Sequence, residues 1–268
     1  MPALPGEAVR AEARAFAERF LAEGPHAGLF AHLRQALGLD VDAMVAGYLR
    51  YAFDSYDSDN SIYDDPAVRC AMQIEYLTPA SYHARRQQLV QDALIRHAPA
   101  SIADIGFGAP MCYLRDYVLA ESGRHAVLFD KFESALQLGR AVVQYWGGDR
   151  SGAVRFAAHD MDAGAAVGAF DCYVLQDAIE HARDPAGYLR ATLRAAPAHA
   201  VLLLQMPLGP LIESHFIAWP DACQALGWLH EFGLREVQVE YVEPNPAADF
   251  FARGENTLTS LFVAARRA

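Results

Sequence analysis

The sequence contains a single lysine, Lys131, and is short of positive charge as a whole. Its 22 lysine and arginine residues stand against 33 aspartate and glutamate residues, so the formal net charge is −11. Binding to nucleic acid or to an anionic membrane requires a basic surface. The charge balance therefore argues against both kinds of partner.

Long apolar runs are also lacking. No stretch approaches the roughly 20 apolar residues that a membrane-spanning helix requires, and the N-terminal segment has no apolar core of the signal-peptide type. Hydrophobic residues nevertheless make up 53% of the 268 positions, which is enough for a substantial core. We expect a soluble, cytoplasmic protein.

Cysteine is scarce, and the four cysteines lie far apart without any Cys-x-x-Cys pair. This spacing argues against disulfides and zinc sites. One cysteine falls within a predicted strand, and we expect free, buried thiols at Cys70, Cys112, Cys172 and Cys223.

A short apolar run, a glycine loop and a helical pattern follow one another around residues 101–110. The run is typical of a buried strand, and the apolar spacing after Pro110 predicts a helix with this proline in its first turn. Glycines let the backbone turn tightly against a ligand, and the amides that begin the helix then point at that ligand. The candidate ligand-binding residues here are Asp104, Gly106, Phe107 and Gly108.

The next three apolar runs also end in polar residues. The first ends at Asp130, about 20 residues beyond the glycines, where an acid suits bidentate hydrogen bonding to a ribose. Because the carboxyl ends of parallel strands share one edge of an open α/β sheet, we expect these residues to meet there. They are Asp130 and Lys131 after the run 126–129, Asp160 and Met161 after the run 154–158, and Gln176 after the run 170–175.

With these motifs, the chain from about residue 101 to residue 268 resembles the class I S-adenosylmethionine (SAM) dependent methyltransferases. The sequence DIGFGAP resembles their glycine motif, usually D-x-G-x-G-x-G, although Pro110 replaces the third glycine. The resemblance implies SAM as the cofactor. It places Asp130 on the ribose, Asp160 and Met161 at the adenine, and Gln176 facing the methionine half.

The same resemblance implies a Rossmann-like α/β fold, with a seven-stranded, mostly parallel sheet, an antiparallel last strand and helices on both faces. The alternating runs 234–242 and 257–265 predict a closing antiparallel hairpin. A nicotinamide-binding Rossmann domain would share the glycine loop and the acid. The segment QDAIEH at 176–181 has no counterpart in that alternative.

The first 97 residues show helical periodicity and no strand-like alternation. We expect residues 1–97 to form a helical cap that covers the SAM pocket and supplies part of the substrate site. Residues 98–268 are expected to form the SAM-binding domain. The predicted cap helices span 7–22, 28–37, 40–53, 66–76 and 81–97.

Tyrosine is concentrated in this cap. The rings either pack between helices and sheet or form an aromatic wall that attracts the SAM sulfonium cation. Tyr82, Arg85 and Arg86 precede the first strand, a position that often reaches the SAM carboxylate in related enzymes, although solvation of the arginines at the surface is the alternative. The tyrosines are Tyr48, Tyr51, Tyr56, Tyr63, Tyr76 and Tyr82.

An acidic segment from Asp54 to Pro66 interrupts the cap helices. Its alternating acids suggest a calcium loop, but the EF-hand template requires glycine and glutamate where this chain has Ile62 and Val68. We predict a loop or a gate over the pocket, and no metal site.

Methyl transfer from SAM requires aligned reactants and exclusion of water, and it needs a base only when the acceptor must lose a proton. The histidine of a Glu-His pair at this place is often structural in relatives. An aspartate beside it would hold a substrate amine or hydroxyl, or would cap a helix. The candidate catalytic residues are His181, His215, Asp177 and Tyr76.

The sequence is compatible with three functions. The first is a SAM-dependent methyltransferase that acts on a small-molecule acceptor in specialised metabolism. The second consumes SAM without methylation, as azetidine-2-carboxylate synthases do when they cyclise SAM and release methylthioadenosine. The third is a SAM-binding module without chemistry. The substrate is a small molecule or SAM itself, and a homodimer is left open.

Overall fold

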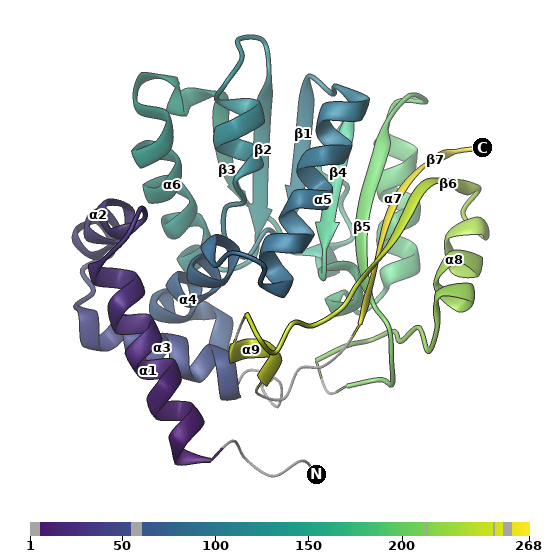
Figure 1. Ribbon diagram of the computed structural model, residues 1–268. Coiled ribbons are helices and arrows are strands. Elements are labelled where there is room, and N and C mark those ends of the chain that lie inside the picture. The colour runs from purple at the N-terminus through teal and green to yellow at the C-terminus, as the bar shows by residue number, and fades with distance from the viewer. Residues whose placement is uncertain (1–5, 55–60, 213, 249, 254–258) are drawn as a thin grey trace.

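The computed structural model describes residues 6–54, 61–212, 214–248, 250–253 and 259–268. Within these residues a seven-stranded sheet has the order β3-β2-β1-β4-β5-β7-β6. Strands β1 to β5 are parallel, and β7 is antiparallel to both β5 and β6, which confirms the predicted α/β sheet (Figure 1). The strands are β1 Ser101–Ile105, β2 His125–Asp130, β3 Val154–Ala158, β4 Cys172–Gln176, β5 Val201–Pro207, β6 Leu234–Val242 and β7 Ser260–Arg267.

Alternate side chains of the central strands enter two separate cores, as the pleat of a strand dictates. Ile102 and Leu128 belong to one core, whereas their neighbours Ala103 and Val127 belong to the other. Helices α5 and α6 line the first core, and α7 and α8 line the second. The helices are α5 Tyr82–His97, α6 Glu133–Gly147, α7 Pro185–Ala195 and α8 Ala222–His230.

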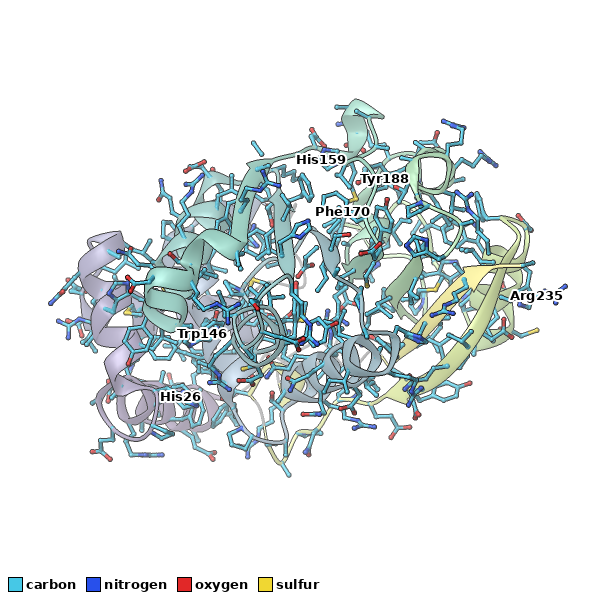
Figure 2. The ribbon with its side chains drawn as sticks, turned by 90° about the horizontal axis from the view of Figure 1, so that it is seen from above. His26, Trp146, His159, Phe170, Tyr188 and Arg235 are labelled. Carbon is cyan, nitrogen blue, oxygen red and sulfur yellow. The ribbon has the colours of Figure 1, made fainter. Side chains whose placement is uncertain are left out.

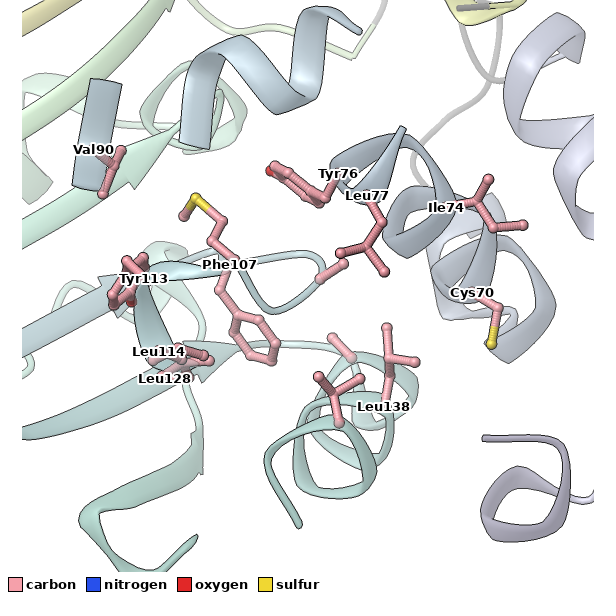
Figure 3. Close-up of a cluster of buried hydrophobic side chains, with 14 of the residues drawn as sticks. Cys70, Ile74, Tyr76, Leu77, Val90, Phe107, Tyr113, Leu114, Leu128 and Leu138 are labelled. Atoms are coloured by element: carbon pink, nitrogen blue, oxygen red, sulfur yellow. The ribbon is translucent and has the colours of Figure 1, made fainter. Parts of the chain in front are cut away.

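The N-terminal helices were predicted from the periodicity of the sequence, and the observed bounds agree with the predicted ones to within one residue at each end. Their apolar side chains join the first core without a break, so α4 meets the glycine loop and α6 directly (Figure 3). Ser81 caps α5 as predicted, because its hydroxyl accepts a hydrogen bond from the amide of Ala84 at 2.9 Å. The helices are α1 Glu7–Ala22, α2 Ala27–Leu37, α3 Val41–Asp54 and α4 Pro66–Leu77.

The predicted helix after the glycine loop is wrong. The chain forms only a short π-helical turn, η2 Leu114–Val118, whose amide at Leu119 donates to the carbonyl of Leu114 at 2.7 Å. Met111 and Tyr113 are fully buried whereas Arg115 and Asp116 are exposed, so the segment keeps the one-sided burial that its apolar spacing predicts although its turn is π-helical. Pro110 therefore lies before the turn, and the glycine loop is followed by this turn and not by the start of a regular helix.

Short helical turns complete the described chain. None of the described helices has both the length and the apolar character needed to cross a membrane. The four thiols are free as predicted. Cys223 is exposed and Cys112 is only partly buried, so the prediction of burial is wrong for these two. The turns are η1 Ser61–Asp64, η3 Gly148–Ala153, η4 Met161–Ala163, η5 Ile179–His181 and the short helix α9 Phe250–Arg253.

Candidate active site

A cavity lies at the carboxyl edge of the parallel strands, between the strand tips and the helical cap. Residues that follow β1, β2, β3, β4 and β5 line it on one side, and residues of α4 and α5 line it on the other. The strand order reverses between β1 and β4, which is where open α/β sheets bind their ligands. Segments far apart in the sequence therefore converge on this one cavity.

The glycine loop requires glycine at two positions. Gly106 and Gly108 have φ angles of 66° and 63°, which side chains rarely adopt. A Cβ on Gly106 would lie 2.9 Å from Cβ of Ala178, and a Cβ on Gly108 would lie 2.6 Å from Cε of Met72. The amide of Gly106 donates to the carbonyl of Phe129 at 2.7 Å, which fixes the turn against β2.

Asp130 lies beside this loop at the tip of β2, as predicted. One carboxylate oxygen accepts the amide of Gly108 at 3.3 Å and the other accepts the amide of Phe132 at 2.9 Å. A buried arginine of the cap, Arg69, places its Nη2 3.6 Å from the carboxylate, and its Nη1 donates to the carbonyl of Gly108 at 3.3 Å. Arg69 was not predicted from the sequence, where its one signal is a charge in a mostly apolar helix.

Residues after β3 form another wall. Asp160 and Met161 line the cavity, and Asp160 accepts the amide of Asp162 at 3.0 Å. His159 also lines the cavity, although the sequence analysis did not select it. Its Nε2 lies 2.9 Å from the hydroxyl of Tyr188, and Figure 2 shows the two side chains near each other.

Asp104 and Lys131 lie at the margins of the cavity. Asp104 is buried behind the glycine loop and does not line the cavity, and the hydroxyl of Tyr113 donates to it at 2.8 Å. Burial raises the pKa of Asp104 to about 7, because a carboxylate is poorly stabilised there. Lys131 is exposed at the rim and lies 4.9 Å from the ring centroid of Phe132.

Gln176 ends β4 with its side chain in the cavity wall. It is buried, yet neither its amide oxygen nor its amide nitrogen has a hydrogen-bond partner among the described residues. Buried amides are normally paired. This side chain is therefore suited to a polar ligand.

Asp177 follows in a strained conformation, with a φ angle of 43° that is uncommon outside glycine. Its carboxylate forms a 2.8 Å ion pair with Arg86 of α5. Arg86 is buried in the cavity wall, whereas Arg85 is exposed and lies outside it. Successive helical residues point about 100° apart, so the prediction of Arg85 at the site is corrected to Arg86.

Glu180, His181 and His215 meet where the segments after β4 and β5 touch. The rings of His181 and His215 have centroids 4.8 Å apart, and the amide of Phe216 donates to the carbonyl of Glu180 at 2.7 Å. Burial and the neighbouring His181 lower the pKa of His215 to about 3. Burial also lowers the pKa of His181, so both rings are neutral at physiological pH.

Four tyrosines from the cap line the cavity: Tyr51, Tyr63, Tyr76 and Tyr82. Tyr48 instead donates to Glu75 within the cap, and Tyr56 lies outside the described residues, as do 55–60 of the predicted gate. Burial raises the pKa of Tyr76, so this phenol stays protonated and is suited to donate a hydrogen bond rather than to act as a base.

No protein-family model matches the chain, and no curated protein matches it in sequence. Solved structures do match its fold. The [4+2]-cyclase SpnF matches with a TM-score of 0.54 at 16% identity, over 71% of this chain and 83% of its own. Mitomycin 7-O-methyltransferase MmcR matches with a TM-score of 0.54 at 17% identity, over 99% of this chain and 74% of its own.

Magnesium protoporphyrin IX methyltransferase (ChlM) from Synechocystis PCC 6803, solved with bound S-adenosylhomocysteine (SAH), matches with a TM-score of 0.52 at 13% identity, over 83% of this chain and 94% of its own. The strand order and the glycine loop agree with these likenesses. The chain therefore has the fold of the class I SAM-dependent methyltransferases.

Proposed function

We propose that the cavity binds SAM and that the protein transfers its methyl group to a small-molecule acceptor. The observation that carries this proposal is the convergence of three unrelated segments on one cavity. They are the glycine loop, the Asp130 carboxylate and the unpartnered amide of Gln176. The fold neighbours that are methyltransferases support the same conclusion.

The side chains present fit SAM. Each oxygen of Asp130 accepts one backbone amide, and a carboxylate oxygen has two lone pairs, so acceptor capacity remains for two ribose hydroxyls. On the opposite side, Nε of Arg86 has no acceptor among the described residues, so the guanidinium retains a donor for the carboxylate of the amino-acid half. Bound SAM supplies an electrophilic methyl group on its sulfonium.

The protein's own contribution is alignment and exclusion of water. The tyrosines of the cap and the ion pair between buried Arg86 and half-buried Asp177 enclose the reacting region. The faces of the tyrosine rings would also stabilise the sulfonium of SAM, by about 0.5–2 kcal/mol for each well-placed ring. Burial lowers the pKa of both His181 and His215, so both imidazoles are neutral in the cavity wall.

A second candidate, conversion of SAM without methylation, is favoured by the aromatic lining itself. Four tyrosines and the half-buried carboxylate of Asp177 form an enclosure in which the α-amine of SAM would attack its own γ-carbon and release methylthioadenosine. The likeness to SpnF, a [4+2]-cyclase, indicates that this fold is not confined to methyl transfer.

Product analysis separates the two candidates. The purified protein is incubated with SAM alone and with SAM plus a panel of small hydroxyl and amine acceptors, and the products are identified by mass spectrometry. SAH formed only with an acceptor supports methyl transfer, whereas methylthioadenosine without an acceptor supports cyclisation. Arg86→Ala is expected to abolish turnover and its exposed neighbour Arg85→Ala to retain it. No turnover of SAM under any condition contradicts both candidates.

A further inference from the structure

Two imidazoles and a carboxylate lie within reach of a common centre in the cavity wall. One ligand atom from each of Glu180, His181 and His215 lies within 4.8 Å of the other two. The backbone bond from Phe216 to the carbonyl of Glu180 holds the segment after β5 against turn η5. The three side chains are thus brought together by the fold rather than by chance contact of exposed ends.

The orientation of His181 leaves one ring nitrogen free to bind. Its Nδ1 lies 2.9 Å from the backbone carbonyl of Ser214. A carbonyl only accepts, so Nδ1 carries the proton and donates it, and Nε2 presents a lone pair. A metal-ligating histidine almost always donates its other ring N–H to a carbonyl or carboxylate in this way.

Glu180 supplies the independent observation. Its side chain has no exposed surface, and neither carboxylate oxygen has a hydrogen-bond partner in the described part of the chain. Arg86, the nearby buried cation, is already paired with Asp177 at 2.8 Å. A buried carboxylate without a partner is costly, and a bound cation would remove that cost.

We infer that Glu180, His181 and His215 form a binding site for a divalent transition-metal ion. Two neutral imidazoles and one carboxylate are the donor set of catalytic zinc sites and of open non-haem iron sites. Three protein ligands leave coordination positions open, and all three residues line the cavity, so the open positions face the reacting region.

The metal site narrows the acceptor class, and this step rests on the proposed function. A metal ion lowers the pKa of a water molecule bound to it from about 16 to about 7 and acts in the same direction on other bound hydroxyl groups, so an alcohol, phenol or enol acceptor would lose its proton to water without a strong base. The resulting oxygen anion forms a bond to the methyl carbon, the carbon–sulfur bond breaks with its electron pair on sulfur, and SAH leaves. The acceptor atom is therefore oxygen.

Cobalt(II) alone is a suitable probe, because its visible absorption reports coordination number. The full chain is treated with a chelator, dialysed and titrated with Co²⁺, and Zn²⁺ is then added in competition. We expect one equivalent to bind with the absorption of four- or five-coordinate Co²⁺, to be displaced by Zn²⁺, and to raise the temperature of unfolding. Glu180→Gln and His215→Ala should each weaken binding at least tenfold.

The matched control is His230→Asn, because His230 lies on the exposed end of α8 and pairs with Glu236 outside the cavity. This variant should bind Co²⁺ as the unaltered chain does. Absence of stoichiometric binding, or equal binding by Glu180→Gln and the unaltered chain, overturns the metal site. SAH affinity is measured on the same metal-free protein. SAH binding without Co²⁺ binding rejects the metal site alone, and Co²⁺ binding without SAH binding rejects the proposed function alone.

Discussion

At the scale of single residues, the most consequential contact is the buried ion pair between Arg69 and Asp130. Arg69 comes from the cap and Asp130 from the sheet, and both side chains are less than 7% exposed. Arg69 also donates to the carbonyl of Gly108. One side chain therefore joins the cap both to the glycine loop and to the Asp130 carboxylate, the two groups proposed to bind SAM.

Replacing Arg69 by methionine leaves Asp130 charged and buried without its cation. We expect the free energy of unfolding to fall by about 3–5 kcal/mol, as for other broken buried pairs. Urea denaturation of Arg69→Met, Asp130→Asn and the double variant measures the coupling between them. The double variant should lose clearly less than the sum of the single losses, and strict additivity would contradict a direct interaction.

Asp104 should make stability depend on pH. Its pKa rises from 3.8 to about 7 on folding because of burial, so between these values the native chain binds more protons than the unfolded chain. The free energy of unfolding contributed by this group therefore falls as pH rises from about 4 to about 7, by at most about 4 kcal/mol. In Asp104→Asn the difference in stability between pH 5 and pH 8 should shrink. An unchanged difference in urea denaturation would refute the assignment.

At the scale of elements, helix α4 is positioned by its close approach to α3. A Cβ on Gly47 of α3 would lie 2.4 Å from the backbone carbon of Ala67 in α4. Because α4 carries Arg69 and Tyr76 into the cavity, the spacing of these two helices sets the position of one wall of the site.

Gly47→Ala should therefore force the helices apart and lower the free energy of unfolding by about 1–3 kcal/mol. The matched control is Gly227→Ala in α8, where a Cβ would meet nothing within 4 Å. There the change should be neutral or stabilising by up to about 1 kcal/mol, because alanine favours helix over glycine. Equal effects of the two substitutions in thermal unfolding would count against the close packing of α3 and α4.

Sequence patterns anticipated these elements to different degrees. Single-faced helices such as α1, and buried strands such as β5, have a period that identifies them. The segment 111–118 has helical spacing and an exposed strip at Arg115 and Asp116, so its period predicted a regular helix where the chain makes a π-helical turn. Periodicity reports a buried face and does not distinguish an α-helical turn from a π-helical one.

The residues of the site also differ in how far the sequence predicts them. Gly106, Gly108 and Asp130 could be predicted because they lie at fixed positions in a local motif. Arg69 and the proposed role of Glu180 could not, because they depend on tertiary contacts with residues 35 or more positions away, and a helical register alone does not distinguish Arg86 from Arg85. The proposed metal site was not predicted from the sequence, because its ligands come from segments that the fold brings together.

At the scale of the whole molecule, cap and sheet form one continuous core. Buried residues of α1, α3, α4, α5, β1 and β2 belong to the same cluster, and Figure 1 shows α1, α3 and α4 near the end of the sheet where the strand tips lie, with α5 along its face. A ligand held between the strand tips and α4 would therefore stabilise both parts together, by an amount that grows with its concentration over its dissociation constant.

The central claim is that this cavity binds SAM with Asp130 on the ribose, and titration calorimetry with SAH tests it most directly. We expect one equivalent of SAH to bind the unaltered chain, and Asp130→Asn to bind about 5- to 150-fold more weakly, which corresponds to about 1–3 kcal/mol of charged hydrogen bonding. No binding of SAH to the unaltered chain, or equal affinity of the two proteins with both folded, would contradict the account.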